Sequence, residues 1–471
     1  MSATTVPTGV TPRSVARTPI YLRGFYLSHA IGAAIVIMLL GSARLDLVNV
    51  PVIRATWFPV YLLAAYLILD RVGRRGRMDL TYWDLLNIGL LGFFGVALIV
   101  ADLAYGFRAL GAVAYIAFLL TTGFPYLLYI IFRESSLRVG FDWRIVFKWV
   151  FVAGIVAAVA SILQFVDAPG VRTFLATVNR WDLDPQRFTN VVLSPNMGRG
   201  LLAHPNLMAG VSAMLLACVP LVASFPKWRY VAYGSIPLFL ACTLATTSRT
   251  GLLTAFAVLL SWAVHFLITK QYTKSMAVVG AVALAAVSTI VTIQVFDIER
   301  LKVILTRPEI VARTQEQTLT VWSRIDRINV AIERASRYPL TGLAPMGVAG
   351  ADTGKVTYSP FYFETITMNA PADAFQRYGF VGLMFIGGQI VLLGMTALSR
   401  RLSLPARATG LGFTAAILTN SIGENPGFSP LVIMFAAAFL AFVAHDVIVL
   451  KLRYPARPQI ARDRVGPVAH R

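Results

Sequence analysis

Cysteine and charge are both scarce in this chain. Only two cysteines occur, Cys218 and Cys242, and each lies inside an apolar run. The sequence therefore excludes a disulfide framework and contains no metal-ligand spacing. Charged residues make up 14% of the 471 positions, against 57% for hydrophobic ones. That balance excludes an ordinary soluble domain and is typical of a polytopic membrane protein.

Acidic residues are fewer than basic ones: 22 Asp and Glu stand against 42 Lys and Arg, which gives a formal net charge of +20. A basic chain can bind nucleic acid, but here the basic clusters lie in short segments between apolar runs. This is the pattern of cytoplasmic loops, with some added attraction to anionic lipid headgroups. We therefore expect membrane lipids, and no nucleic acid, as partners.

Apolar runs long enough to cross a hydrocarbon layer of about 30 Å recur along the chain. They predict an all-α polytopic membrane protein with about 12 transmembrane helices. The spans lie near residues 25–41, 56–69, 82–101, 108–132, 144–166, 201–224, 229–246, 250–268, 275–295, 376–397, 404–422 and 428–449. If the basic loops face the cytoplasm, both termini do so as well. Those loops are 71–77, 133–144, 227–229, 270–274 and 400–407.

One long hydrophilic segment interrupts the apolar pattern before the last three predicted helices, and the orientation places it in the periplasm. Within it, apolar residues recur at helical spacing and predict an amphipathic helix on the outer surface. Those residues are Val321, Ile325, Ile328, Ile332 and Ala335, and Pro339 and Gly342 end the pattern. The predicted parts are a basic tail 1–24, helices in 25–296, the loop 297–375, helices in 376–449 and a basic tail 450–471. A shorter outer segment covers 167–200.

Three arginines lie at the predicted outer membrane edge. Arg199 precedes the sixth span, Arg249 follows the seventh, and Arg324 begins the amphipathic helix. One interpretation is that each arginine extends to the lipid headgroups. The other is a shared site for a diphosphate, because guanidinium groups pair with phosphate oxygens in a fork and stay charged.

Further polar residues are predicted on the same side. His204, Pro205 and Asn206 lie one to two turns into a span, where the proline favours a kink and Asn206 can bond the freed backbone. Among carboxylates, Glu364, Asp373 and Glu424 lie near the outer edge. Each is either a solvated charge, a helix cap or a base.

The chain resembles the O-antigen ligase and O-antigen polymerase superfamily of bacterial inner-membrane glycan enzymes. The matching residues follow one order along the chain: Arg199 with His204, Pro205 and Asn206; Ser248 with Arg249; Arg324 to Ile328 with Pro339 to Gly342; and Asn369 with Gly379 and Gly382. The resemblance covers roughly residues 195–385 in motif and the whole chain in predicted topology.

One position departs from the ligase pattern. Ligases of this superfamily place a histidine directly before the residue that corresponds to Asn369 and use it to handle the acceptor hydroxyl. This chain has Met368 there, and a methionine side chain cannot accept that proton. The departure favours a polymerase-type member, or one with a carboxylate base such as Asp373.

The resemblance implies a membrane glycosyltransferase at the periplasmic face of the bacterial inner membrane. It would move a glycan from undecaprenyl diphosphate to a sugar or lipid-linked acceptor, without cofactor or metal. Arg199, Arg249 and Arg324 would bind the diphosphate. Asp373 with Arg324 would be catalytic, and the supporting residues would be His204, Asn206, Asn369, Glu364 and Glu424. The alternatives are ligase-type transfer to a lipid acceptor, and a twelve-helix transporter or lipid-linked sugar flippase.

The topology can be tested with reporter fusions. We expect a fusion at Gly76 to report the cytoplasm and a fusion at Gly350 to report the periplasm, because only the first lies in an arginine-rich loop. Enzymatic reporters of both sides should be compared at each position. Reports of the same side from both positions would contradict the orientation.

Overall fold

The computed structural model describes thirteen segments of the chain, which are residues 20–40, 58–73, 80–104, 124–138, 140–178, 198–202, 205–280, 282–283, 328–333, 336, 339–340, 369–423 and 430–443. Their main helices are α1 Ile20–Leu40, α2 Phe58–Gly73, α3 Tyr82–Ala104, α5 Phe124–Ser136, α6 Trp143–Phe165, α7 Val171–Val178, α9 Pro205–Ala223, α10 Arg229–Ala245, α11 Arg249–Ile268, α15 Ala370–Leu398, α16 Leu404–Gly423 and α17 Pro430–Val443. No β-strand occurs among these residues. The predicted all-α class is confirmed for this part of the chain.

Apolar helices of membrane-spanning length are present. Within the described ranges, four are long and apolar enough to cross a bilayer: Trp143–Phe165, Pro205–Ala223, Arg249–Ile268 and Gly379–Leu398. Shorter apolar helices cover Gly24–Leu39 and Met434–Val443. The chain is thus a helical protein suited to a membrane, while the number of 12 spans and their orientation stay predictions. The predicted spans 108–132 and 275–295 lie partly outside the described residues.

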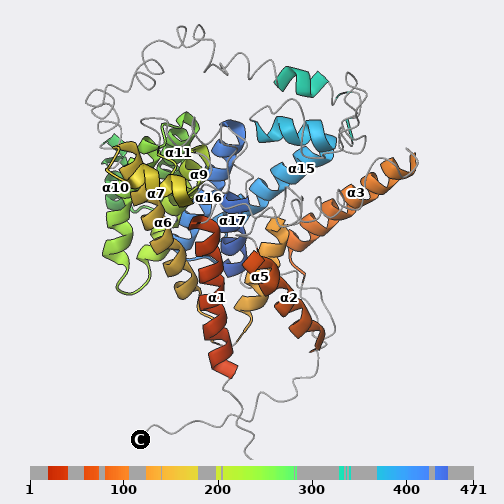
Figure 1. The fold of residues 1–471 in the computed structure, drawn as a ribbon, viewed down its shortest axis with the longest axis horizontal. Coiled ribbons are helices and arrows are strands. Elements are labelled where there is room, and N and C mark those ends of the chain that lie inside the picture. The colour runs from red at the N-terminus through yellow and green to blue at the C-terminus, as the bar shows by residue number, and fades with distance from the viewer. Residues whose placement is uncertain are drawn as a thin grey trace, which may run out of the picture.

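The centre of the bundle is α9 (Figure 1). Every residue of this helix except Asn206 and Ala223 is buried, and it contacts α6, α10, α11, α16 and α17. Small residues let its neighbours approach closely: a Cβ atom added to Gly412 of α16 would lie 2.9 Å from Ala217 Cβ. Such contacts are the usual basis of helix association in a membrane.

Hydrogen bonds between helices add to this packing. Ser212 Oγ of α9 donates to the Phe239 carbonyl of α10 at 2.8 Å. The indole N–H of Trp262 in α11 donates to the Ala408 carbonyl of α16 at 3.1 Å. Each bond joins two helices through a side chain that would otherwise be an unsatisfied polar group in an apolar interior.

The outer face of the bundle is apolar. Along α6, Trp149, Val152, Val156, Val159 and Leu163 are exposed, and their spacing of three and four residues places them on one face. Val146, Val150 and Ala157 on the other face are buried. An apolar surface on the outside of the bundle is what a hydrocarbon environment requires.

The amphipathic helix predicted within the long loop is described in part. Residues 328–333 of the predicted amphipathic helix are helical, with Ala331 buried and Ile332 45% exposed; Val321 and Ile325 lie outside the described residues. The short helix α7 was not predicted and lies in segment 167–200, for which an outer location stays a prediction. Cys218 and Cys242 are both buried and free, as expected.

Candidate functional site

Ends of distant helices meet at one end of the bundle. Gly198 N donates to the Ala245 carbonyl at the end of α10 at 2.7 Å. A Cβ atom on Gly251, in the first turn of α11, would overlap Ala209 in the second turn of α9. Asn369 Nδ2 donates to the Ile422 carbonyl near the end of α16 at 2.9 Å. We call this region the helix-end cluster, which comprises residues 164, 198–202, 205–210, 245–251, 369–373 and 420–422.

Arg199 lies in a tight turn on the surface of α6. Its backbone N–H donates to Gln164 Oε1 at 2.9 Å, and the Gly200 N–H donates to the same oxygen at 3.1 Å. Gly200 has a left-handed conformation (φ 58), and a Cβ atom there would lie 2.8 Å from the Ala157 carbonyl oxygen. The turn buries Arg199 to 1% exposure. The sequence predicted an arginine at the membrane edge, whereas the structure shows a guanidinium group enclosed by protein.

Arg249 is the first residue of α11. Ser248 caps the helix by accepting from Gly251 N at 3.1 Å, and Thr247 before it has a left-handed backbone (φ 52). The Arg249 side chain is exposed. A cation at a helix N-terminus adds to the positive end of the helix dipole, an arrangement that is unfavourable by itself and favourable beside an anion. This position is therefore suited to an anionic ligand.

The predicted kink at Pro205 is wrong. The helix α9 begins at Pro205, so the proline occupies the first helical position, where its missing N–H would have no partner within the helix in any case. The predicted span had started four residues earlier. Asn206 follows in the first turn and is partly exposed, at the same end of the bundle as Arg249.

Asn369 has a structural role. Its side chain accepts from Ala372 N at 2.9 Å and so caps α15, while its amide joins α16 as described above. Asp373 lies in the first turn of the same helix. Because Asn369 is the cap of α15, Asp373 is not the capping residue. Its backbone thereby belongs to the helix-end cluster.

Gly379 interrupts α15 and receives a segment of the long loop. Its backbone (φ 61, ψ −151) is not helical and lies in a region that only glycine adopts readily. Phe380 N donates to the Pro339 carbonyl at 2.7 Å, and a Cβ atom on Gly379 would overlap that oxygen and lie 2.6 Å from the Leu340 carbonyl carbon. Two motifs 40 residues apart in the sequence are thus in contact.

Several predicted site residues lie outside the described part of the chain. They are His204, Arg324, Glu364, Met368 and Glu424, together with the side chain of Asp373. The structure therefore places Arg199, Arg249, Asn206 and Asn369 in one cluster and leaves the other assignments as predictions. Among the described residues, no group of three or more His, Cys, Asp or Glu side chains could hold a metal ion.

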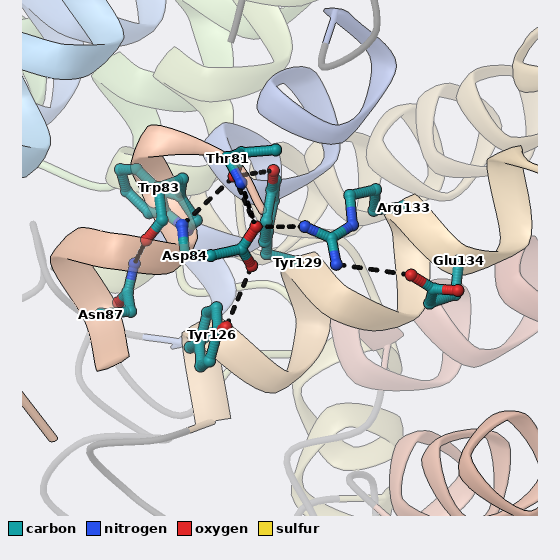
Figure 2. A network of polar contacts seen from close by, with 8 residues as sticks. All are labelled: Thr81, Trp83, Asp84, Asn87, Tyr126, Tyr129, Arg133 and Glu134. Atoms are coloured by element: carbon teal, nitrogen blue, oxygen red, sulfur yellow. Dashed lines mark hydrogen bonds and ion pairs between the residues drawn. The ribbon is translucent and has the colours of Figure 1, made fainter. Parts of the chain in front are cut away.

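A second polar group, which was not predicted from the sequence, lies between α3 and α5 (Figure 2). Arg133, assigned to a cytoplasmic loop, is instead a buried residue of α5 that pairs with Asp84 of α3. The carboxylate also accepts from Thr81 N at 2.7 Å, from Thr81 Oγ1 at 2.7 Å and from Tyr126 OH at 2.9 Å. Tyr129 OH lies 2.8 Å from Thr81 Oγ1.

The polar network around Asp84 and Arg133 lies far from the helix-end cluster. The pair lies next to the start of α6, because α5 ends at Ser136 and α6 begins at Trp143. Gln164 stands near the other end of this helix of 23 residues, a length of about 34 Å. A sequence signal existed: a threonine followed three residues later by an acid, before an apolar run, is a capping box.

Comparison with known proteins adds no assignment. No protein-family model matches the chain, and no curated protein matches its sequence. The resemblance to the O-antigen ligase and polymerase superfamily therefore rests on the short motifs and their order.

The contact between Gly379 and Pro339 can be tested by substitution. We expect Gly379→Ala to lower the free energy of unfolding by at least about 1–3 kcal/mol, because it combines a strained backbone with steric overlap. The measurement is thermal unfolding in detergent. Gly387→Ala in the same helix is the control, since a Cβ atom there would meet nothing within 4 Å. Equal melting temperatures for the two variants would contradict the contact.

Proposed function

We propose that the protein is a membrane glycosyltransferase that takes a glycan from undecaprenyl diphosphate and transfers it to an acceptor sugar at the periplasmic face of a bacterial inner membrane. The observation that carries this proposal is the gathering of Arg199 and Arg249 in one helix-end cluster. Arg199 is buried in it and Arg249 starts α11 at its surface. Two cations at adjoining helix ends favour a ligand with more than one negative charge.

A diphosphate fits this arrangement. The reaction breaks the bond between the anomeric carbon of the glycan and the diphosphate oxygen, and the acceptor hydroxyl oxygen forms the new bond. Negative charge then develops on the departing diphosphate, where preorganised cations lower the barrier. Arg249, exposed and next to the helix N-terminus, would contact the phosphates first, and Arg199 would fix their position. Arg324 of the long loop would complete the set.

The acceptor hydroxyl must lose a proton, and Asp373 is our choice of base. Its backbone lies in the first turn of α15, beside the junction of Asn369 with α16. Glu364, Glu424 and His204 are the other groups predicted on this side that could accept the proton. Arginine charge at the diphosphate would make a metal ion unnecessary.

Repeat-unit polymerisation of a surface polysaccharide is favoured over ligation to a lipid acceptor. Met368 stands where the ligases have their histidine, so the ligase base is missing at that position. Analysis of surface polysaccharide after deletion of the gene separates the two activities. Short chains would indicate a polymerase, whereas free polymer without attachment would indicate a ligase.

The buried pair of Asp84 and Arg133 is the one observation that favours a transporter or a lipid-linked sugar flippase. Ionisable residues inside a membrane bundle commonly mark transport pathways. Here, however, the Asp84 carboxylate already accepts hydrogen bonds from Thr81, Tyr126 and Arg133, which describes a link between α3 and α5. Accumulation of lipid-linked repeat units on the cytoplasmic face of a deletion strain would support the flippase.

Removal of the Arg249 side chain should abolish transfer while the protein still folds. We expect Arg249→Ala to lower transfer by roughly 10²–10³-fold, equivalent to about 2.7–4 kcal/mol of transition-state stabilisation, and Arg324→Ala to act similarly. Lysine should restore little activity, because an ammonium group cannot form the planar fork. The measurement is glycan transfer by purified protein in reconstituted membranes.

Arg229→Ala is the matched control for this experiment. Arg229 is also an exposed arginine at the first position of a helix, α10, but it lies at the opposite end of that helix from Ala245. Near-normal transfer by Arg229→Ala with loss in Arg249→Ala supports the site. Near-normal transfer by both Arg249→Ala and Arg324→Ala would refute it.

The base can be tested with two neighbouring substitutions. Asp373→Asn keeps the shape and removes proton acceptance, so turnover should fall by roughly 10²–10⁴-fold. Met368→Leu should leave turnover unchanged, because methionine has no titratable group. Transfer in the same reconstituted membranes is the readout. Full activity of Asp373→Asn would remove it from the mechanism and direct attention to Glu364, Glu424 or His204.

A further inference from the structure

Gln164 accepts two hydrogen bonds from the Arg199 turn and was not among the predicted site residues. It stands in the last turn of α6 and is 1% exposed. The backbone N–H groups of Arg199 and Gly200 both donate to its Oε1 atom. Because two donors require an acceptor, these bonds also fix the orientation of the amide: oxygen faces the turn and nitrogen faces away from it.

The other end of this amide has no hydrogen-bond partner among the described residues. Gln164 Nε2 is buried, and none of those residues offers it an acceptor. A buried donor without an acceptor is unfavourable, and a bound acceptor would remove that cost. Ser161, one turn earlier on the same face of α6, is also buried.

The turn is held closely against this face of α6. A Cβ atom on Gly198 would overlap the Ser161 carbonyl oxygen and lie 2.6 Å from Ser161 Oγ. Gly200 approaches Ala157 in the same way, so both glycines lie directly on α6. Gln164 thereby sets the position of the buried Arg199 and presents a donor next to it.

We propose that Gln164 has two roles in the helix-end cluster: its Oε1 positions the Arg199 turn, and its Nε2 donates to an oxygen of the same anionic ligand that Arg199 binds. The ligand class is a lipid-linked diphosphate, and in this respect the inference rests on the proposed function. Gln164 is a neutral donor among cations, which adds a directed hydrogen bond where the arginines supply charge.

The test measures binding of undecaprenyl diphosphate, without glycan, to the full-length protein in lipid nanodiscs. Gln164→Glu keeps an acceptor for the two backbone N–H groups but replaces the donor with a carboxylate oxygen that repels the ligand. We expect at least a ten-fold loss of affinity with a melting temperature within a few degrees of the wild type. Gln164→Met, which has similar length and no amide, is the second variant and should also lose affinity.

Gln389→Glu is the matched control. Gln389 of α15 is also buried, and its Nε2 atom lacks a partner within the described ranges, but it lies in the middle of a helix away from the cluster. Its affinity should equal that of the wild type. Wild-type affinity in a folded Gln164→Glu or Gln164→Met protein overturns the inference and leaves the proposed function standing. Absence of binding by the wild type overturns the proposed donor and this inference with it.

Discussion

The close packing of α9 against its neighbours depends on residues with small side chains at the points of contact. Gly251 meets Ala209, Gly412 meets Ala217, and Gly210 lies 3.3 Å from Val432 when a Cβ atom is added. A helix enclosed in this way leaves little freedom in where the neighbouring helices end. The start of α11, the end of α16 and the turn before α9 consequently meet at one place. The helix-end cluster is a result of that packing.

Polar groups are distributed unevenly over the bundle. Its outside is apolar along helices such as α6, and single hydroxyl groups in the interior bond to backbone carbonyls. Ionisable side chains concentrate at two ends of the helices. One end contains the Asp84 and Arg133 pair, in which opposite charges satisfy each other. The other contains Arg199 and Arg249 and is the end where added negative charge would be favourable.

Parts of the motif that carry the family resemblance now have structural explanations. Asn369 caps α15 and joins it to α16, and Gly379 allows the chain to accept the Pro339 segment. Both residue types would be required by the fold alone, so neither is evidence for catalysis. The proposed chemistry therefore depends on the arginines, on the identity of the base and on the methionine at position 368.

The sequence by itself determined the helical class and the positions of most of the described helices, because the length of an apolar run acts locally along the chain. It placed the start of α9 too early and treated Arg133 as a loop residue, since neither error changes the local hydropathy pattern. Only the tertiary structure decided that Arg199 is buried, that Gln164 holds its turn and that Pro339 contacts Gly379. These facts depend on contacts between residues distant in sequence, which composition and spacing do not encode.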